Sequence, residues 1–447
     1  NTGINVVANG INVQAGILTA KNIIDATDAQ GNTRVGSAAG DSFDGTNAEN
    51  NTLIGKNSGT AITGGDGNTV VGSECGGAFT TAGSNVAIGY LCYNTATTAN
   101  SGVAVGVNAM RLTTTGSYNV AVGQESLYAN TTGASNVAIG YQALDANTTA
   151  DGNTAIGRAA LGANTTGTAN VSVGAYALDA NTTGGNNTAV GYEALGANTT
   201  ASYNTAVGRY AMKLNTTGAD NSAFGYNALD ANTTGDDNTA LGTNALGANT
   251  TADNNTAVGK NSLVTNTTGD RNVAVGKDAL YSCSTHSANV AIGFEAMKLN
   301  TANSNTAIGA YAMDANTGGG DNSALGSNAL GGNTTGGNNS AFGVSALYAN
   351  TTESYNSAFG AGSLAANTTG SFMTAVGYEA LNDNTTGQYN TACGGRALDV
   401  NTTGSYNTAM GVNALGANTT ADSNTAVGYA ALLSNTTGTY NLSLIHI

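Results

Sequence analysis

The sequence contains no proline and no tryptophan, and only 9% of its 447 residues are charged. Asparagine, threonine and alanine dominate instead, together with 64 glycines. A chain of this length would ordinarily form two or three globular domains, but much of its 40% apolar content is alanine, so no single site can build a thick core. Disordered chains combine high charge with few apolar residues, and this chain does not. The composition favours a long, thin object with a thin core.

Basic residues are scarce as well: 12 Lys and Arg stand against 27 Asp and Glu, which gives a net charge of −15. Phosphate binding needs a basic stripe, so we expect no nucleic-acid partner. Acidic residues such as Glu193, Asp230 and Asp314 occur singly, which is typical of a solvated exterior. No apolar run is long enough to span a membrane, and we expect no membrane insertion. The chain begins at Asn1 rather than at Met, so we expect a fragment or a processed form.

Groups that carry out catalysis or bind metals are few. His286 is the only histidine before the last six residues, and no HExxH motif or pair of carboxylates accompanies it. The four cysteines, Cys75, Cys92, Cys283 and Cys393, lack the spacing of metal ligands. We therefore expect no enzyme, no metal site and no cofactor.

A five-residue phrase, N-[TVS]-A-[VILF]-G, returns through most of the chain. It begins at 51, 68, 85 and onward to 424, and Asn441 opens an interrupted further copy. All but one of the intervals between 51 and 441 equal that from 51 to 68; the one from Asn289 to Asn305 is shorter by a single residue, lost in "NTANS". An imperfect copy, "NTRVG", starts at Asn32, slightly more than one interval before 51. A fixed short period is the signature of a solenoid.

The unit 187–203, "NTAVGYEALGANTTASY", defines positions 1 to 17 as used below. Its T-A-V-G predicts a short strand that stacks on its own copies as a parallel ladder, with positions 2 and 4 on one face and 3 and 5 on the other. We expect Val190 (position 4) and Leu195 (position 9) to form the core, next to the small Ala194. Position 3 and Gly191 at position 5 would allow close approach by the other wall of the coil or by another chain.

Asparagine recurs at two positions of the unit. Asn187 (position 1) and Asn198 (position 12) are expected to form amide ladders along the axis, as stacked asparagines do in cross-β structures. Asn198 also opens N-T-T, which indicates a turn. Positions 6 to 12 could form a second short strand or a single helical turn, and we favour an extended or turn-like second side.

Together these patterns predict an all-β protein, a parallel β-solenoid (β-roll) with about 23 coils, each formed by one unit of positions 1 to 17. Because parallel sheets are usually covered on both faces, we expect an intertwined oligomer. Residues 32–441 would form the solenoid. Residues 1–31, with a hairpin signal at Asn9-Gly10, would form a β-rich N-terminal connector. Residues 442–447, "LSLIHI", resemble a translated sequencing adapter, and we expect a non-native tail.

Two further features depend on the coil. Cys75 and Cys92 both fall at position 8, one coil apart, which is within disulfide reach; two buried thiols are the alternative, because position 8 is otherwise Ala or Ser. Tyrosines gather at positions 17 and 6, where they would either grip sugars of a host surface or pack on one another across coils. These tyrosines are Tyr118, Tyr203, Tyr355, Tyr389, Tyr406 and Tyr440 at position 17, and Tyr141, Tyr192, Tyr226, Tyr378 and Tyr429 at position 6.

The phrases "NVAIG" (85–89, 136–140, 289–293) and "NVAVG" (119–123, 272–276) resemble the head repeats of trimeric autotransporter adhesins, which are trimers of left-handed parallel β-rolls. The longer unit "NTAVGYEALGANTTG" is similar to repeats in tail-fibre proteins of bacteriophages. The resemblance covers about 390 of the 447 residues. The unit is longer than the repeat of the adhesin heads, and neither the stalk nor the anchor of those adhesins is present. The resemblance therefore implies a homotrimeric tail fibre rather than an anchored adhesin.

The leading functional hypothesis is a structural and adhesive fibre shaft, a phage tail fibre that attaches to a glycan or protein receptor on a host surface. A bacterial cell-surface adhesin is the alternative, so the location would be the virion or the extracellular surface. An ice- or carbohydrate-binding solenoid that uses rows of threonine belongs to another class. The strand reads T-A-V rather than T-x-T, which argues against ice.

Overall fold

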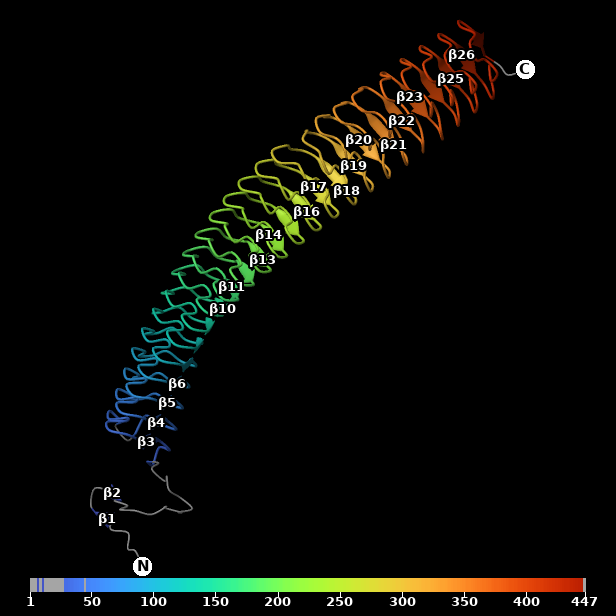
Figure 1. The fold of residues 1–447 in the computed structure, drawn as a ribbon. Helices are drawn as coiled ribbons and strands as arrows, with labels where there is room; N and C mark the ends of the chain where they lie inside the picture. Colours follow the sequence, from blue (N-terminus) through green and yellow to red (C-terminus); the bar gives the residue numbers. More distant parts are fainter. Residues whose placement is uncertain (1–5, 8–9, 12–27, 44–45, 445–447) are drawn as a thin grey trace, which may run out of the picture. The chain divides into compact units, whose positions relative to one another are not determined.

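The computed structural model describes residues 6–7, 10–11, 28–43 and 46–444. The chain divides into two compact units, Asn1–Ser135 and Asn136–Ile447, here the first and the second unit. Secondary structure in the described residues consists of strands and turns, without a helix. Each unit is considered by itself, in the order in which its strands follow along the chain (Figure 1).

In the first unit a short antiparallel pair precedes a parallel ladder. Val7 pairs with Gly10 in antiparallel, as a hairpin in this segment predicts, but Gly10 lies in a strand rather than in the expected turn. Asn9 lies outside the described residues, as does most of 1–31. The strands are β1 (Val6–Val7), β2 (Gly10–Ile11), β3 (Thr33–Val35), β4 (Thr52–Ile54), β5 (Thr69–Val71), β6 (Val86–Ile88), β7 (Val103–Val105) and β8 (Val120–Val122).

The second unit is one long parallel ladder of short strands. The strands are β9 (Val137–Ile139), β10 (Thr154–Ile156), β11 (Val171–Val173), β12 (Thr188–Val190), β13 (Thr205–Val207), β14 (Ser222–Phe224), β15 (Thr239–Leu241), β16 (Thr256–Val258), β17 (Val273–Val275), β18 (Val290–Ile292), β19 (Thr306–Ile308), β20 (Ser323–Leu325), β21 (Ser340–Phe342), β22 (Ser357–Phe359), β23 (Thr374–Val376), β24 (Thr391–Cys393), β25 (Thr408–Met410), β26 (Thr425–Val427) and β27 (Leu442–Ser443).

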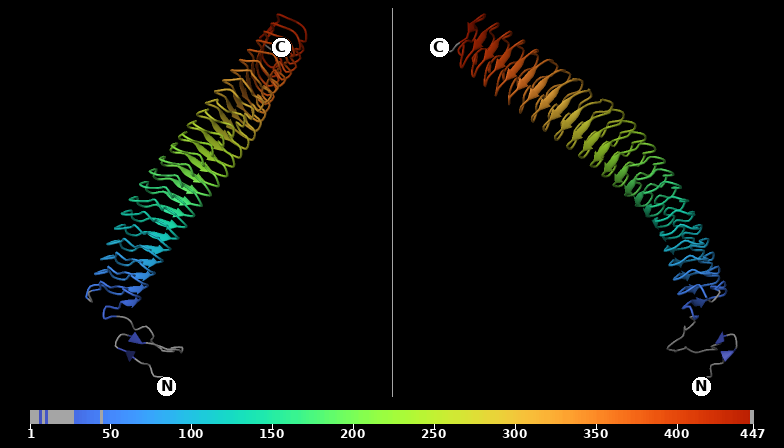
Figure 2. Two further views of the ribbon diagram at one scale, coloured as in Figure 1. Left: turned by 60° about the vertical axis from the view of Figure 1, so that its left-hand side comes forward. Right: turned by 180° about the vertical axis from the view of Figure 1, so that it is seen from behind.

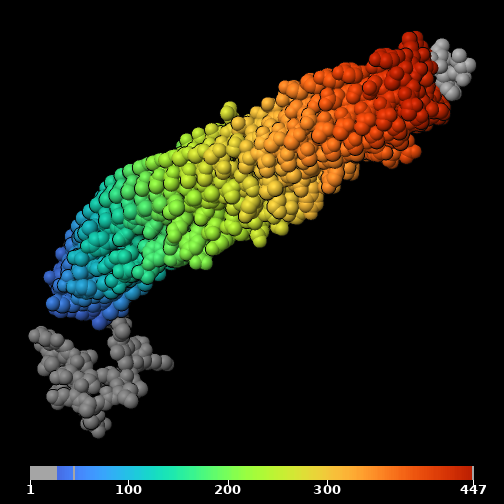
Figure 3. Space-filling view, turned by 45° about the horizontal axis from the view of Figure 1, so that its top comes forward, coloured from blue at the N-terminus to red at the C-terminus, as the bar shows by residue number. Residues whose placement is uncertain are grey.

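Equal positions of successive coils lie directly beside one another. In β12 and β13, Val190 pairs with Val207 in parallel, and the same register repeats along the second unit. Figure 2 shows the strand arrows of this unit in one row and the turns on the opposite side of each coil. Neighbouring coils pack against each other along the surface seen in Figure 3. The predicted fold class is confirmed: both units are parallel β-solenoids in which each coil corresponds to one copy of the repeated unit.

Strand pairing stays in register where the interval between copies of the unit is irregular. The shortened coil keeps its register, since Val290 pairs with Thr306. Its missing residue lies in the turn, where the Asn300 side-chain amide donates to the carbonyl of Ala302, two residues on rather than the usual three. The longer first coil also stays in register, because Thr33 pairs with Thr52. At the other end, Leu442 pairs with Thr425, so the expected tail begins by continuing the ladder.

The interior of each coil is filled from both walls. In the unit 187–203, the strand contributes Ala189. The rest of the coil, positions 6 to 17, which we call the turn side, contributes Ala194 and Leu195. All three side chains are fully buried. Val190 instead points outward and is only half-buried, so the prediction that it forms the core is wrong. The physical reason is that the coil is narrow. Leu195 fills most of its interior, and the space beside Leu195 admits only the methyl group of Ala189 at position 3.

The turn side is neither a second strand nor a helical turn, so the turn-like alternative describes it. Ala194 N–H donates to the carbonyl of Gly191 (3.3 Å), and Asn198 N–H donates to that of Leu195 (3.1 Å), which makes successive tight turns. Other N–H groups of this side bond neighbouring coils: that of Glu193 donates to the carbonyl of Ala175 (3.1 Å) in the preceding coil. The turn side is therefore held both by its own turns and by the coils beside it.

Gly191 is required by the stacking itself. Its φ is +139°, a conformation that side chains rarely adopt. A Cβ on Gly191 would lie 2.4 Å from the carbonyl oxygen of Gly208 in the next coil. The group that approaches position 5 closely is therefore the backbone of the neighbouring coil in the same chain, rather than the other wall of the coil or another chain.

The first unit departs from the repeat at position 12, where Ile62 and Phe79 replace asparagine and are fully buried. Phe79 packs edge-on against Tyr93, with ring centroids 5.2 Å apart. Tyr93 stands at position 9 in place of leucine, and a Cβ on Gly102 would lie 2.6 Å from its hydroxyl. This explains why position 1 of the next coil is glycine: the tyrosine fills the space of the ladder asparagine.

Candidate functional site

The two asparagine positions form the expected ladders. The side-chain amide of Asn198 donates to Asn181 Oδ1 (2.9 Å) in the preceding coil and to the carbonyl of Ala201 (3.0 Å) in its own. The side-chain amide of Asn187 also donates to Ala201 (2.8 Å) and to Asn170 Oδ1 (3.2 Å). Both ladders therefore converge on the carbonyl at position 15, where they tie the end of the turn to the start of the strand. Both asparagines are fully buried.

Cys75 and Cys92 lie inside the first unit as free thiols, fully buried. Hydrogen bonding with the Cys92 thiol, and then burial, raise the pKa of the Cys75 thiol. The Cys92 thiol also donates to the carbonyl of Ala104 (3.2 Å). In the second unit, burial raises the pKa of Cys283 to about 11. Cys393 stands at position 4, the position expected to form the core, and is exposed, so the expectation fails here for the same reason as for Val190.

The outer face of the sheet in the second unit carries an uninterrupted apolar column. Position 4 is apolar in every strand from β9 to β26, and position 2 is Thr, Ser or Val throughout, so this face has no charged residue. We call position 4 of these strands the outer column; the Thr, Ser and Val side chains of position 2 lie beside it on the same face. Phe224 is 39% exposed and Leu241 48%, and the rings of Phe342 and Phe359 stack 4.9 Å apart. Large exposed apolar surfaces of this kind mark interaction sites.

The threonines of the N-T-T turn form two rows, at positions 13 and 14, which differ in their surroundings. At position 13, the hydroxyl of Thr199 donates to the carbonyl of Thr216 in the next coil (3.1 Å), and Thr216 repeats this with Thr233 (2.9 Å). These hydroxyls are therefore used within the ladder. Thr200, at position 14, is exposed.

The tyrosines at positions 17 and 6 are exposed and also pack across coils. Tyr355, Phe372, Tyr389 and Tyr406 form a stack along position 17 with centroids 5.1 to 5.3 Å apart and nearly parallel rings. Tyr389 and Tyr406 nevertheless remain 45% and 62% exposed. In this stack each ring therefore contacts its neighbours across coils and still faces solvent.

A second aromatic cluster crosses four consecutive coils and was missed from the sequence. Tyr176, Tyr192, Tyr210 and Tyr226 contact one another in turn, with centroids 5.7 to 6.3 Å apart. The guanidinium of Arg209 lies 4.4 Å from the centroid of the Tyr210 ring. The four rings alternate between positions 7 and 6, so grouping tyrosines by a single position separates them. An aromatic residue at either position in successive coils is the signal that finds them.

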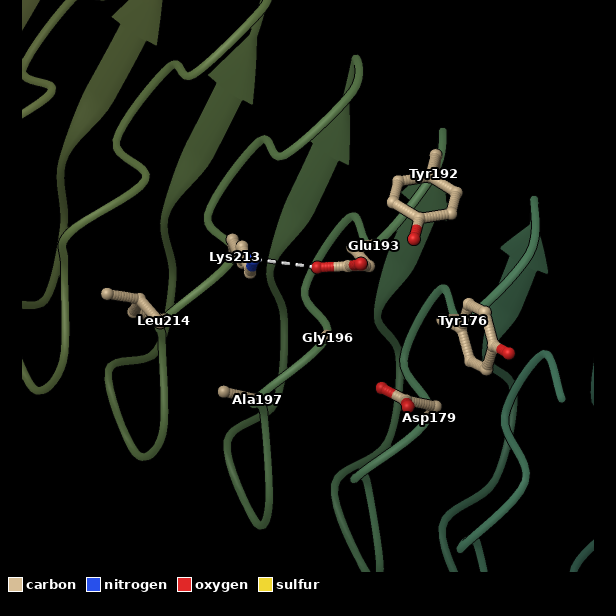
Figure 4. Close-up of a pocket in the computed structure, with 8 residues that line it drawn as sticks. All are labelled: Tyr176, Asp179, Tyr192, Glu193, Gly196, Ala197, Lys213 and Leu214. Carbon is tan, nitrogen blue, oxygen red and sulfur yellow. Dashed lines mark ion pairs between the residues drawn. The ribbon is translucent and has the colours of Figure 1, made fainter.

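A hollow of about 450 Å³ lies beside this cluster (Figure 4). It is the candidate site of the second unit, because it combines aromatic rings with charged groups on an otherwise repetitive surface. Its lining residues are Tyr176, Asp179, Tyr192, Glu193, Gly196, Ala197, Lys213 and Leu214.

The charged groups of the hollow differ in their surroundings. Lys213 Nζ forms an ion pair with Glu193 Oε2 at 2.7 Å, drawn as the dashed line in Figure 4. The hydrogen bond from Lys213 lowers the pKa of Glu193, and that from Glu193 raises the pKa of Lys213. Asp179 is half-buried, and burial raises the pKa of its carboxyl. A hydrogen bond with Glu193 raises the pKa of Tyr192.

Metal-binding clusters and membrane-spanning helices are both absent from the described part of the chain. Within residues 28–43 and 46–444, no three His, Cys, Asp or Glu side chains come together in a way that could hold a metal ion. The same described residues include no helix of the length and apolar character that a membrane span needs.

Comparison with protein-family models gives no match for this chain, and comparison with curated proteins gives none either.

Proposed function

We propose that this chain forms the shaft of an adhesive fibre, assembled from several copies of itself and carried by a virion or a cell surface. The fibre would be a homotrimer that spaces a contact with a host-surface glycan or protein receptor. A tail fibre of a bacteriophage is the leading form of this proposal, and a bacterial surface adhesin is the other.

The outer column carries the proposal. One face of the parallel sheet is covered by the turn side of the same coil, whereas the other presents Val, Ile, Leu, Phe and Met side chains to solvent along the second unit. Parallel sheets normally have both faces covered. Burying apolar surface contributes roughly 25 cal/mol per Å², and a column repeated in every coil adds this gain coil by coil. A second and a third copy of the chain offer the same column and the same repeat, so equal coils can meet equal coils.

The trimer and the attachment role draw on the resemblance of the repeated phrase to trimeric heads and tail fibres. Three copies arranged around one axis would each turn the outer column toward the others. The turn side, with its exposed tyrosines and charged groups, would then face outward. A receptor contact along the shaft would use that side.

The test is the mass of the chain in solution. Sedimentation equilibrium at micromolar concentration is expected to give three times the chain mass of 43.8 kDa. The triple variant Val207→Glu, Phe224→Glu and Leu241→Glu places three charges on the outer column and is expected to give the monomer mass, because each carboxylate would have to be buried between chains.

A matched variant controls for added charge. Thr217→Glu, Thr234→Glu and Thr251→Glu introduce the same charges into the same three coils, at exposed positions of the turn side. This variant should remain trimeric. A monomer mass for the unaltered chain, or an unchanged mass for the outer-column variant, would overturn the proposal.

A further inference from the structure

We propose that the hollow at Gly196 is a saccharide site that takes one neutral pyranose unit of a glycan. This inference rests on the proposed attachment function, since it names the receptor chemistry and the place on the shaft that would contact it. Four observations carry it: the gap left by Gly196, the two tyrosine walls, the placement of the charges, and the contrast with a sister coil.

The gap arises from a missing side chain in one column. Position 10 holds Asp179, Gly196 and Lys213 in three successive coils. A Cβ on Gly196 would meet Asp179 Oδ1 at 3.5 Å and the Glu193 carbonyl at 3.4 Å, which is ordinary contact, and the φ of Gly196 is not positive. The backbone there does not demand glycine. Glycine leaves a hollow that a side chain could otherwise occupy.

The walls are aromatic and held in place. The rings of Tyr176 and Tyr192 meet edge to face, with centroids 6.1 Å apart and an interplanar angle of 87°. The guanidinium of Arg158 lies 5.3 Å from the Tyr176 centroid, and that of Arg209 lies 5.9 Å from the Tyr192 centroid, distances at which cations attract ring faces. The C–H groups on one face of a pyranose pack against such rings, and pre-positioned rings lose little freedom on binding.

The polar groups fit hydroxyls rather than an anion. The Asp179 carboxyl points toward the coil that carries Gly196 (Figure 4). Lys213, the cation of the lining, is already paired with Glu193. The lining itself holds two carboxylates and one ammonium, and the guanidiniums of Arg158 and Arg209 lie against the rings of its walls. Carboxylates accept hydrogen bonds from hydroxyls, and the ammonium donates to ring or hydroxyl oxygens, whereas the carboxylate of an acidic sugar would lie close to Asp179 and Glu193.

The coil of Gly247 offers a contrast within the same chain. There too a Cβ would meet an aspartate, Asp230 Oδ1, at 3.4 Å, and a backbone carbonyl at 3.4 Å. Positions 6 and 7 of that coil are Thr243 and Asn244, and the next position 10 is Val264. The backbone and the aspartate are shared, whereas the aromatic wall and the ion pair belong to the Gly196 site.

The chain also shows how the hollow can be filled. Tyrosine stands at position 10 in other coils, and the ring of Tyr348 leans over the preceding coil, 3.2 Å from where a Cβ on Gly331 would lie. Gly196→Tyr should therefore place a ring over Asp179 and close the site. Gly247→Tyr should do the same over Asp230, away from the site. Both variants keep the ladder, which far-UV circular dichroism and the urea midpoint would verify.

The experiment measures binding of methyl glucopyranoside, galactopyranoside and mannopyranoside to the full chain by saturation-transfer NMR, with methyl glucuronide as the acidic comparator. At least one neutral glycoside should bind, and Gly196→Tyr should weaken it at least about tenfold, or ~1.4 kcal/mol. Gly247→Tyr should change the affinity by less than about twofold. Asp179→Asn, which keeps the shape of the hollow, should weaken binding as well.

Three results would overturn the inference: no neutral glycoside binds, only the glucuronide binds, or Gly196→Tyr binds as well as Gly247→Tyr. Failure here is separate from failure of the fibre proposal. The hollow lies within one chain, so the monomeric outer-column variant should bind the same glycoside. A monomer mass for the unaltered chain with retained binding would contradict only the fibre, and a trimeric unaltered chain without binding would contradict only the site.

Discussion

At the scale of single residues, each coil contains conformations that a free chain would avoid. In the unit 187–203, Glu193, Leu195 and Tyr203 all have positive φ, between 51° and 63°. A non-glycine residue there costs roughly 1–2 kcal/mol. The neighbouring coils offset this cost, because the N–H of Leu195 donates to the Ala211 carbonyl of the next coil (3.0 Å). The local shape of a coil is therefore fixed by the coils beside it.

Gly191→Ala should destabilise the second unit by about 2–6 kcal/mol, combining strain of ~1–3 and overpacking of ~1–3 kcal/mol. The added methyl would lie 2.4 Å from the Gly208 carbonyl oxygen, and φ of +139° does not suit alanine. Urea unfolding followed by circular dichroism would measure the change. Gly196→Ala is the matched control and should stay within about 0.5 kcal/mol of the parent. Equal midpoints for the two variants would contradict the role assigned to position 5.

The aspartates at position 10 predict an unusual response to acid. Burial is the largest cause of a raised pKa at Asp179, Asp230, Asp314 and Asp399. With pKa values higher in the folded than in the unfolded chain, the folded state takes up protons first. This contribution is fully present below the unfolded pKa of about 3.9 and is lost as pH rises through the folded pKa. The free energy of unfolding should therefore rise as pH falls from about 7 toward about 4.5.

The pH response has its own control. The hydrogen bond with Lys213 lowers the pKa of Glu193, and hydrogen bonds with Tyr378 and then Arg396 lower the pKa of Glu379. These shifts favour the opposite trend, but both ion pairs are solvent-exposed and weak. A variant with asparagine at Asp179, Asp230, Asp314 and Asp399 should lose most of the rise between the two pH values. Urea midpoints at the two pH values, taken at low protein concentration, would compare the stability of the parent chain with that of this variant. A parent chain that loses stability on acidification more steeply than this variant would refute the prediction.

At the scale of elements, the two walls of a coil are joined by buried amides rather than by a thick apolar core. The amides of Asn187 and Asn198 both donate to the Ala201 carbonyl while each also bonds the preceding coil. Each amide therefore joins the two walls of its own coil and also bonds this coil to the preceding one. This explains how coils with little apolar volume hold a defined shape, since buried polar groups that are satisfied specify one arrangement.

Asn198→Ala should lower the free energy of unfolding by about 1–3 kcal/mol, because the acceptors on Asn181 and Ala201 lose a buried donor. Hydrogen exchange should show faster exchange in the coils on either side of the change than in distant coils of the second unit. Thr200→Ala, in the same turn but exposed, should have an effect within about 0.5 kcal/mol. Similar exchange for both variants would mean that the ladder does not stabilise the coil.

The sequence predicts the strand and its register but not which face of the strand is buried. T-A-V has one small and one large apolar residue on opposite faces, so alternation alone allows either orientation. The rule that the larger side chain is buried favours Val190 and fails, because Leu195 already fills the narrow interior. What decides the orientation is the width of the coil, which depends on the path of the turn side. That path uses positive φ at residues such as Glu193 and Leu195, for which sequence signals are weak.

The candidate site was predictable in its parts but not in its assembly. The exposed tyrosines at positions 6 and 17 follow from the repeat. The hollow needs Tyr176 at position 7, Tyr192 at position 6 and the absent side chain of Gly196 to meet across coils. Such neighbours can be identified only when the register of the turn side is known, since the turn fixes how far positions 6 and 7 lean toward the next coil.

At the scale of the whole second unit, every strand contacts only the strands one coil away. The stability of such an array is close to a sum of coil terms and nearest-neighbour terms. A coil is then an exchangeable part, provided that its two neighbours meet in register. The shortened coil supports this, because its lost residue is absorbed in one turn without a change in strand pairing.

Deletion of residues 238–254 should therefore leave a folded chain. This removes β15 with its turn and brings Asn255 into the place of Asn238. The N–H of Asn255 can then donate to Asn221 Oδ1, as that of Asn238 does at 2.9 Å in the intact chain. The circular dichroism per residue should be unchanged and the urea dependence only slightly reduced, since m-values scale with the surface exposed on unfolding.

Deletion of residues 238–246 alone is the discriminating comparison, because it removes the strand and the first part of the turn side but leaves positions 10 to 17 of the same coil, with Asn249 and its N-T-T turn, in place. The remaining residues 247–254 are too few to complete a coil, so Asn255 could take the place of Asn238 only if they looped out of the stack, which would disturb the amide ladders between the coils on either side. This shorter deletion should cost far more stability than the longer one. If the two deletions were equally harmful, stability would depend on the length removed rather than on register, and the second unit could not be a stack of exchangeable coils.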